Sequence, residues 1–470
     1  MPNTPVHRRE IDSRPRILRE WPSEAADEIA YGFTRRYPDM AARSGFARWQ
    51  RLTVVVVVVG ISITVALAPL VALVLLAALV TGFSLLNAVV ACAGTRRDRI
   101  EVAPLPEVEL PHYTVLVPAY DESTVIADLV RHLAELDYPH DRLEVLILVE
   151  RHDPATARAA LSADPPAFVR IVELPPGEPR TKPRSVNMGL RLARGELLVI
   201  FDAEDRPELD QLRRIAARFA AADDRLAVVQ AQLFYDNGDR NWLTRQFAME
   251  YALRFGLLMP GMLRLGLPIP LGGTSNHFRT AILRTLGGWD AWNVTEDADI
   301  GMRCAALGYR VEMSDTITWE PAVHTASGFV RQRTRWLKGF LMTTVVHTRH
   351  PGRTWRRFGG AGLVSLLGMI ASAPVTAIAQ PILLALDLLA VTGLAWSPTG
   401  AAWVLPAIGA QVASIVGWIV ITYTGAARVG QASWQAVFVP LYGSVLWWIA
   451  GWRAAHQLVV SPYSWDKTAH

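Results

Sequence analysis

The sequence predicts an α/β domain with a doubly wound, mostly parallel sheet, inserted between two groups of transmembrane helices. Two observations support this prediction. Between about residues 96 and 350, short apolar runs alternate with charged segments of helical spacing. Long apolar segments lie on either side of this part of the chain, and the apolar fraction of the 470 residues is 51%.

Five short apolar runs in the central part of the chain are predicted to be strands. Segments with helical spacing, such as residues 122–136 and 185–193, lie between the first four of them. This alternation is typical of a parallel sheet, whose ligands bind at the carboxyl ends of the strands. The five runs are residues 113–118, 143–149, 168–172, 197–201 and 226–230.

The first apolar segment is long enough for two membrane-spanning helices, because residues 52–93 run without a charge. We expect these helices within residues 51–95, joined at Pro69, after a polar N-terminal arm over residues 1–50. Arginines on both sides of the segment favour a hairpin whose two ends lie in the cytoplasm.

The chain after the central domain is again apolar, and about four transmembrane helices are expected in residues 351–455. The central domain, residues 96–350, contains two basic and aromatic segments near residues 241–267 and 329–347. Their composition predicts helices that lie on the membrane surface, although buried core helices would show a similar pattern. Residues 456–470 would then form a cytoplasmic tail.

The charge and the cysteines exclude several classes of function. The net charge is only +4, and the polar part has no basic stripe with interleaved aromatic residues, so nucleic acid is not an expected partner. The two cysteines, Cys92 and Cys304, have neither the spacing of a metal site nor that of a disulfide framework. Lysine occurs only as Lys182, Lys338 and Lys467, so each of the three is considered individually as a candidate functional residue.

The first two predicted strands end in residues that could hold a nucleotide. Pro118, Tyr120 and Glu122 follow the first strand, and Glu150 and Asp153 follow the second. A carboxylate at this edge of the sheet could accept hydrogen bonds from a base. An acidic N-cap of the next helix would explain the same pattern, so both interpretations stay open.

Two further clusters predict sites for phosphate and for a divalent cation. Lys182 opens a predicted helix, where a diphosphate would meet both its charge and the helix N-terminus, although a solvated basic turn fits the same residues. Asp202, Glu204 and Asp205 directly follow the fourth strand. Adjacent carboxylates are costly unless a cation compensates them, so Asp202 and Glu204 are expected to bind Mg²⁺ or Mn²⁺. Asp205 could instead cap the following helix.

The segment Thr295-Glu-Asp297 forms another acidic cluster, next to Trp292. An acid held apart from the metal pair, beside aromatic residues, can take a proton from a sugar hydroxyl. A helix N-cap at Thr295 followed by acids in the first turn fits the same residues, and the two interpretations are compatible.

The segment Gln332-Arg-Thr-Arg-Trp336 places Gln332, Arg335 and Trp336 on adjoining faces of a helix. The planar guanidinium of Arg335 suits a leaving diphosphate, and the indole of Trp336 suits the apolar face of a pyranose ring. A membrane-surface anchor of Arg and Trp is the alternative. Taken together, the three clusters predict a site for sugar transfer.

With these clusters in this order, the chain resembles the membrane-embedded glycosyltransferases of family 2, the group of cellulose, chitin, hyaluronan and mannan synthases. The family's T-E-D and Q-x-x-R-W motifs match letter for letter at 295–297 and 332–336, and its D-x-D motif corresponds to Asp202-Ala-Glu204. Glu204 departs from that motif. A second departure is at 150–153, where Arg and His separate two acids that are usually consecutive.

The resemblance implies a GT-A fold and an inverting transfer from a nucleotide sugar, most often a UDP sugar, to a growing glycan. It implies that Asp297 is the general base within a catalytic group that includes Thr295 and Glu296. Asp202 and Glu204 would bind the metal, and Trp336 would bind the acceptor. The nucleotide sugar would be bound by Pro118, Tyr120, Glu122, Glu150, Asp153, Lys182, Asp202, Gln332 and Arg335.

The resemblance also implies that the polysaccharide leaves through a channel formed by the transmembrane helices. Trp465, Lys467 and Thr468 in the tail are similar to loops that close over the nucleotide in such synthases. A multi-pass protein of the bacterial inner membrane with a cytoplasmic catalytic domain is expected, with accessory export or modifying proteins as further partners.

Two alternatives remain open at this point. The first keeps the chemistry but transfers a single sugar to a membrane lipid, such as a polyprenyl phosphate or a glycolipid. The second is a membrane transporter or receptor whose nucleotide-binding domain is degenerate and not catalytic. Product length would distinguish the first alternative, and release of the nucleotide would exclude the second.

Overall fold

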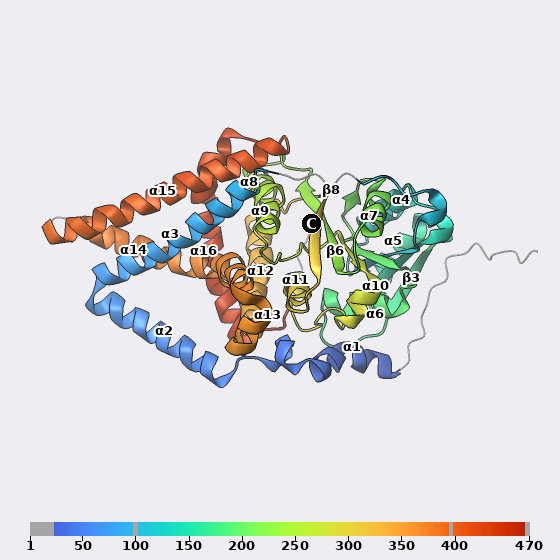
Figure 1. Ribbon diagram of the computed structural model, residues 1–470, viewed down its shortest axis with the longest axis horizontal. Coiled ribbons are helices and arrows are strands. Elements are labelled where there is room, and N and C mark those ends of the chain that lie inside the picture. Colours follow the sequence, from blue (N-terminus) through green and yellow to red (C-terminus); the bar gives the residue numbers. More distant parts are fainter. Residues whose placement is uncertain (1–22, 97–101, 394–397, 466–470) are drawn as a thin grey trace, which may run out of the picture.

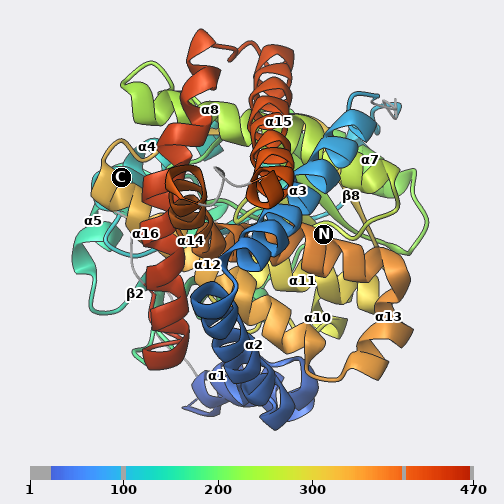
Figure 2. The ribbon, with the colours of Figure 1, turned by 90° about the vertical axis from the view of Figure 1, so that its left-hand side faces the viewer.

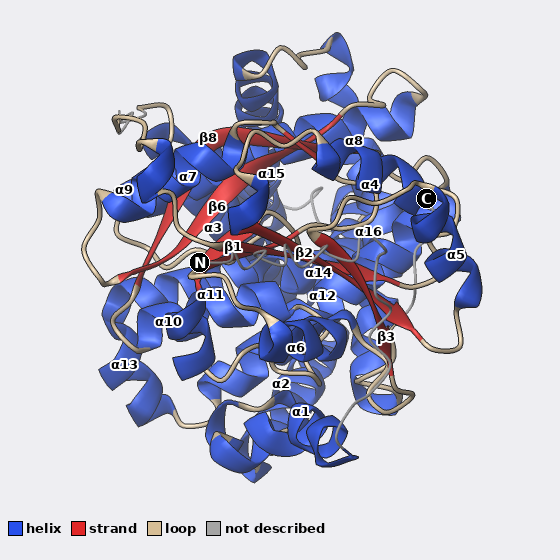
Figure 3. Ribbon diagram, turned by 90° about the vertical axis from the view of Figure 1, so that its right-hand side faces the viewer, coloured by secondary structure: helices blue, strands red, loops and turns tan. Residues whose placement is uncertain are grey.

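The computed structural model describes residues 23–96, 102–393 and 398–465. It has two parts that lie side by side along the longest axis of the molecule (Figure 1). One part is a group of long helices, and the other is a sheet with helices on both of its sides (Figure 3). The N-terminal segment runs along one edge of the sheet domain toward the first long helix (Figure 1).

The sheet has eight strands in the described residues, in the order β3-β2-β1-β4-β7-β6-β8-β5. Strands β3, β2, β1 and β4 are parallel to one another, as are β6 and β8, whereas β7 and β5 are antiparallel to their neighbours. This mostly parallel sheet confirms the predicted fold class, and the five predicted strands are β1, β2, β3, β4 and β6. The bounds are β1 (Tyr113–Ala119), β2 (Leu143–Glu150), β3 (Val169–Leu174), β4 (Leu197–Ile200), β5 (Arg206–Pro207), β6 (Leu226–Tyr235), β7 (Asn276–Arg279) and β8 (Arg310–Glu320).

Alternate residues of the central strands face opposite sides of the sheet. Val115 and Val117 of β1 share a buried core with α4, α5 and α7, whereas Leu116 shares one with α6, α10 and α11. Burial on both faces explains why these strands are continuous apolar runs and why polar residues gather at the strand ends. The helices are α4 (Ile126–Ala134), α5 (Pro154–Ser162), α6 (Lys182–Leu192), α7 (Gln211–Ala220), α10 (Thr280–Thr285) and α11 (Glu296–Ala306).

Four helices of the described residues are long and apolar enough to cross a membrane. They are α2 (Arg48–Leu67), α3 (Pro69–Ala93), α14 (Ser372–Thr392) and α15 (Pro398–Arg428). The first two form the predicted pair, and Pro69 is the first residue of α3. Seen from the helical end of the molecule, α2 runs away from α14 and α15 toward α1 (Ser23–Arg36) (Figure 2).

The segment after residue 351 differs in part from the expected four spans. Residues 351–392 form α13 (Pro351–Leu363), the π-helix η6 (Val364–Ile370) and α14, and within the described ranges α14 alone of these three has the length and composition of a span. A further helix of 22 residues, α16 (Val439–Val460), packs against α14. The total number of spans stays a prediction.

The two segments expected on the membrane surface lie between the sheet and the long helices. The first forms α8 (Trp242–Leu253), the π-helix η5 (Arg254–Leu258) and α9 (Met259–Arg264), and the second lies within α12 (Ala326–Thr348). Glycines allow close backbone contact here. A Cβ atom at Gly94 would lie 1.9 Å from the carbonyl oxygen of Leu257, and one at Gly425 would lie 2.7 Å from Cα of Leu253. The η5 region is therefore packed directly on α3 and α15.

Candidate active site

A cavity of about 380 Å³ lies at the carboxyl ends of the parallel strands. Residues at or after the ends of β1, β2 and β4 line it together with residues of α11, α12 and η5. The structure therefore brings together segments that are far apart in the sequence. The predicted site residues that line the cavity are Pro118, Tyr120, Glu122, Glu150, Lys182, Asp202, Glu204, Thr295, Glu296, Asp297, Gln332, Arg335, Trp336 and Trp465.

The end of the cavity near β1 and β2 combines two rings with an acid. The rings of Tyr120 and His152 lie 5.5 Å apart between centroids. Glu150 accepts hydrogen bonds from Arg184 Nη1 at 3.2 Å and from Ser185 Oγ at 3.4 Å. Burial raises the pKa of Glu150 above its ordinary value, against the lowering effect of Arg184. This end therefore offers flat ring surfaces and one carboxyl acceptor.

Asp153 is a predicted nucleotide-binding residue, but in the structure its carboxyl group accepts hydrogen bonds from two backbone N–H groups. It does not line the cavity, and it is only 8% exposed. Its Oδ1 accepts a hydrogen bond from the backbone N–H of Thr156 at 3.2 Å, so it is the N-cap of α5. Its other oxygen accepts from the backbone N–H of Asp121. The acidic N-cap considered as the alternative is thus the observed arrangement, and Glu150 is the acid of this pair that faces the cavity.

Lys182 and Asp202 form an ion pair in the wall of the cavity. The ammonium group of Lys182 also donates a hydrogen bond to the carbonyl oxygen of Gly273 at 2.7 Å. Burial lowers the pKa of Lys182, but the carboxylates of Asp202 and Glu296 outweigh that effect and raise it above its ordinary value. Lys182 therefore carries its positive charge at the position where the sequence predicts a diphosphate.

Asp205 does not cap the helix that follows it, because α7 begins at Gln211 after Asp210. Its carboxyl group is instead buried, where its Oδ2 accepts hydrogen bonds from the backbone N–H of Asp202 at 2.7 Å and from the hydroxyl of Thr274. Its Oδ1 has no hydrogen-bond partner. Burial, together with the charges of Asp202 and Glu204, raises the pKa of Asp205 well above its ordinary value.

The cavity wall has an excess of acidic side chains. Seven carboxyl groups and four cations line it. The acids are Glu122, Glu150, Asp202, Glu204, Glu296, Asp297 and Glu320, and the cations are Arg180, Lys182, Arg254 and Arg335. Within the described ranges, no three His, Cys, Asp or Glu side chains converge closely enough to hold a metal by themselves. Mg²⁺ is commonly held by one or two carboxylates together with substrate phosphates. The acidic excess and the unpartnered Asp205 oxygen fit such an ion at Asp202 and Glu204.

The T-E-D segment forms the start of α11. Thr295 occupies the N-cap position, but its side chain makes no capping hydrogen bond. Asp297 is half-buried, and its Oδ1 accepts a hydrogen bond from the backbone N–H of Ala298 at 2.8 Å. Burial and the charge of Asp297 raise the pKa of Glu296 to about 8. Burial raises the pKa of Asp297 as well, so both carboxyl groups of this pair bind a proton more readily than a free carboxyl group does.

The Q-x-x-R-W residues project from α12 into the cavity. The amide oxygen of Gln332 is buried there without a hydrogen-bond partner, an arrangement that favours a ligand with a donor group. The guanidinium carbon of Arg335 lies 4.6 Å from the ring centroid of Trp465. Trp336 lies 6.0 Å from the ring of Tyr251, so the two form an aromatic wall. Lys467 and Thr468 lie outside the described residues.

Several lining residues are absent from the sequence-based prediction. Arg254 comes from the π-helix η5, and Glu320 comes from the end of β8, a strand that was not predicted. Burial and the nearby acids raise the pKa of Glu320 well above its ordinary value. Recognising β8 would have identified Glu320, because ligands bind at strand ends in such sheets.

Gly339 of α12 has no space for a side chain, because a Cβ atom there would lie 2.2 Å from Cγ2 of Thr295. Replacing Gly339 with Ala should therefore destabilise the protein by about 1–3 kcal/mol, the usual cost of overpacking. The matched control is Gly352→Ala in α13, where nothing lies within 4 Å of the added atom. The thermal unfolding midpoint in detergent should fall for the first variant and stay near the wild-type value for the second. Equal midpoints for both variants would contradict the close packing of α12 on Thr295.

The central domain matches a protein-family model described as "Glycosyltransferase like family 2" over residues 111–339. Among curated proteins, the chain is 27% identical over 234 residues to the "Probable glycosyltransferase YdaM" of Bacillus subtilis, covering 49% of this chain and 56% of that protein. It is 28% identical over 235 residues to the "Beta-monoglucosyldiacylglycerol synthase" of Trichormus variabilis, covering 49% of each. The chain thus matches about half the length of these curated relatives.

A solved structure supports the fold beyond the central domain. The mannosyltransferase PcManGT from Pyrobaculum calidifontis, in complex with GDP-Man and Mn²⁺, superposes with a TM-score of 0.53 at 22% identity. The likeness covers 83% of this chain and 99% of that one. It confirms that the predicted GT-A arrangement of the sheet domain is the observed one.

Proposed function

Because residues 111–339 match the model of the glycosyltransferase-like family 2, we propose that this protein transfers a sugar from a nucleotide sugar, with UDP as the carrier, to an acceptor at the membrane. One observation carries this proposal. A single cavity is lined by a half-buried carboxylate, a carboxylate pair suited to a metal, two cations and a Trp ring. These groups are Asp297, Asp202 with Glu204, Lys182 with Arg335, and Trp336.

Each of these groups has a role in an inverting transfer. Asp297 takes the proton from the acceptor hydroxyl as its oxygen attacks the anomeric carbon and the bond to the diphosphate breaks. The cations of Lys182 and Arg335 stabilise the negative charge of the leaving nucleoside diphosphate. Asp202 and Glu204 would hold Mg²⁺ or Mn²⁺, which supplies further charge neutralisation on the diphosphate when it is bound.

The nucleotide end of the proposed site is the end near β1 and β2. Tyr120 and His152 offer rings on which a base can stack, and Glu150 offers an acceptor for its N–H group. Trp465 lines the cavity beside Arg335 and would cover the diphosphate. Lys467 and Thr468 remain proposed members of this covering segment.

A growing glycan is the first candidate acceptor. Trp336 and Tyr251 form an aromatic wall on which the apolar face of a pyranose ring can stack. The buried amide oxygen of Gln332 could accept a hydrogen bond from a sugar hydroxyl, which would remove the cost of leaving it unpaired. This proposal includes extrusion of the polysaccharide between the transmembrane helices, with accessory export or modifying proteins as partners.

A membrane lipid is the second candidate acceptor, and the position of η5 favours it. Phe255 of η5 is one of the apolar residues that line the cavity, as are Leu233 and Phe340. Since η5 packs directly on α3 and α15, the part of the cavity lined by Phe255 is next to the membrane helices. A lipid headgroup could therefore reach Asp297 from the bilayer. Under either proposal we place the sheet domain on the cytoplasmic face of the bacterial inner membrane, as the flanking arginines favour.

Product analysis distinguishes the two acceptors. The purified protein in lipid vesicles would be incubated in turn with radiolabelled UDP-glucose, UDP-N-acetylglucosamine, UDP-galactose and GDP-mannose. A labelled polymer that is not extracted by organic solvent supports the growing glycan, and a labelled lipid with one sugar supports the lipid acceptor. Release of the nucleoside diphosphate excludes a transporter or receptor, whereas no release with any donor would overturn the proposed function.

A further inference from the structure

The N-terminal arm contacts the catalytic loop, although it lies outside the segment that matches the family. Its described part consists of α1, followed by the short helices η1 (Pro38–Met40) and η2 (Ala42–Ser44). In Figure 1 it lies along the edge of the sheet domain, on the side of α6 and α10. Two buried charged residues of the central part, Arg349 and Asp290, bind its backbone.

Arg349 holds the arm from the end of α12. Its guanidinium group donates hydrogen bonds to the carbonyl oxygens of Asp39 at 2.9 Å, Ala41 at 3.2 Å and Gly45 at 2.7 Å. An arginine that satisfies several carbonyl oxygens at once holds one backbone conformation. The stretch of residues 38–45 is therefore fixed relative to the helix that carries Gln332 and Arg335.

Asp290 holds the same stretch from the loop that precedes the T-E-D segment. Its carboxylate is fully buried, and its Oδ2 accepts a hydrogen bond from the backbone N–H of Ala42 at 2.6 Å. Its Oδ1 accepts from the backbone N–H of Trp292 at 3.1 Å. The indole N–H of Trp292 in turn donates to the carbonyl oxygen of Ala30 in α1 at 2.7 Å. One buried carboxylate thus joins the arm to the loop.

The loop over residues 287–295 depends on such contacts for its conformation. It contains no helix or strand, and it begins with Gly287 and Gly288, whose φ angles are 84° and 68°. Glycines in this region leave the backbone with few conformational restrictions of its own. Contacts from outside the loop therefore determine its conformation and, with it, the position of the residues that follow, including Asp297.

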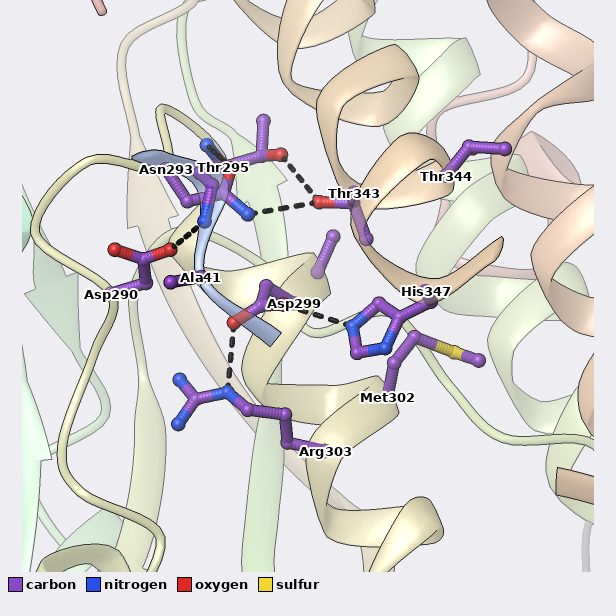
Figure 4. Close-up of polar contacts among 12 residues, drawn as sticks. Ala41, Asp290, Asn293, Thr295, Asp299, Met302, Arg303, Thr343, Thr344 and His347 are labelled. Atoms are coloured by element: carbon purple, nitrogen blue, oxygen red, sulfur yellow. Dashed lines mark hydrogen bonds and ion pairs between the residues drawn. The ribbon is translucent and has the colours of Figure 1, made fainter. Parts of the chain in front are cut away.

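Further hydrogen bonds continue from this loop to the proposed base. The side-chain oxygen of Asn293 accepts from the backbone N–H of Thr295 at 3.1 Å, and its amide donates to Oγ1 of Thr343 in α12 at 3.2 Å. Figure 4 shows Asn293 and Thr295 facing Thr343, with Asp290 of the same loop directed toward the arm beside Ala41. Two residues after Thr295 the chain reaches Asp297, which lines the cavity.

We propose that Asp290 is a positioning residue: it binds residues 38–45 of the arm to the loop over residues 287–295 and so holds Asp297 at the reacting hydroxyl. This proposal rests on the proposed function. Asp290 does not line the cavity, so its effect is on the position of Asp297 and not on the binding of the nucleotide. A displacement of about 1 Å at a reacting group can lower a rate about 10²-fold.

The test compares Asp290→Asn with Asp39→Asn. Asparagine keeps the shape of the Asp290 side chain but has one acceptor oxygen instead of two. The backbone N–H of Ala42 or that of Trp292 therefore loses its acceptor. The second variant acts on the same arm but away from the loop, where Asp39 pairs with His350 and Arg353 at the exposed outer side. Exposed ion pairs contribute little to stability, so Asp39→Asn should leave kcat at the wild-type value.

For Asp290→Asn we expect kcat, measured by nucleoside diphosphate release, to fall about tenfold to a hundredfold while the donor KM stays within about twofold. Hydrogen exchange should rise in peptides that cover residues 38–46 and 289–298. Wild-type kcat with raised exchange in both peptides would overturn the proposal. Unchanged hydrogen exchange in residues 289–298 would overturn the proposal as well. If the wild-type protein turns over no donor, the proposed function fails, and the exchange measurement still tests the contact of Asp290.

If Asp290→Asn does not fold, Ala42→Pro tests the same contact from the arm. It removes the N–H that donates to Asp290, and Ala42 is the first residue of η2, a position where proline is tolerated. Ala41 is extended, with φ −91° and ψ 133°, as a residue before proline must be. The same fall in kcat with unchanged donor KM is expected, and wild-type kcat would overturn the proposal.

Discussion

Replacing Asp297 with Asn should lower kcat about 10²–10⁴-fold, the range attributed to general-base catalysis. Asn keeps the shape of the side chain and can still accept the hydrogen bond from Ala298, but it cannot take a proton. The donor should still bind, because Lys182 and Arg335 are unchanged. The measurements are nucleoside diphosphate release for kcat and calorimetric titration for the affinity of the donor.

The control for this substitution is Asp128→Asn in α4, whose carboxylate is on the exposed surface. It should behave as the wild type in both measurements. Wild-type turnover by Asp297→Asn would remove the role of Asp297 as base. A loss of donor binding equal to the loss of turnover would instead assign Asp297 to the binding of the nucleotide sugar.

Removing divalent cations should reduce turnover to the background rate, and adding Mg²⁺ or Mn²⁺ should restore it. The reason is electrostatic: a diphosphate would add negative charge beside the carboxyl groups of Asp202 and Glu204 in the cavity wall. Without a cation, Lys182 and Arg335 would have to compensate both the carboxylates and the diphosphate. The measurement is nucleoside diphosphate release after treatment with EDTA and after titration of each cation.

The matched variants for this prediction are Asp202→Asn and Glu150→Gln. Asp202→Asn should raise the cation concentration needed for half-maximal turnover about tenfold or more, because one of two carboxylate ligands is lost. Glu150→Gln lies at the nucleotide end of the same cavity and should raise the donor KM without changing the cation requirement. Turnover that is insensitive to EDTA would contradict the metal assignment.

The strands that could be predicted are those buried on both faces. Residues of β1 and β2 form continuous apolar runs because helices cover both sides of the sheet at these strands. The strand β7 has only four residues, and β8 alternates polar and apolar residues over Arg310–Glu320. β7 is too short to show a local pattern, and it pairs with β6, which is remote in the sequence. The alternation in β8 is the pattern of a half-buried strand, so here the sequence contained a signal that the prediction did not use.

Many of the site residues that could be predicted lie at strand ends or at helix starts, where position along the chain already implies position at the cavity. Gln332, Arg335 and Trp336 lie within α12 instead, and their motif identified them. Asp153 shows the limit of this reasoning, because an N-cap and a ligand-binding acid have the same local sequence. Arg254 and Glu320 reach the cavity through η5 and β8, whose placement depends on tertiary packing. The contacts of Arg349 with backbone carbonyl oxygens leave no pattern in the sequence at all.

The most direct test of sugar transfer is a balance of donor and product with the purified protein in lipid vesicles. A doubly labelled nucleotide sugar, with one label on the nucleotide and one on the sugar, follows both halves of the reaction. We predict equal amounts of released nucleoside diphosphate and of sugar bound to a membrane or polymer product, and loss of both in Asp297→Asn. Release of the nucleotide together with free sugar, or no release from any donor, would contradict a transfer reaction at this site.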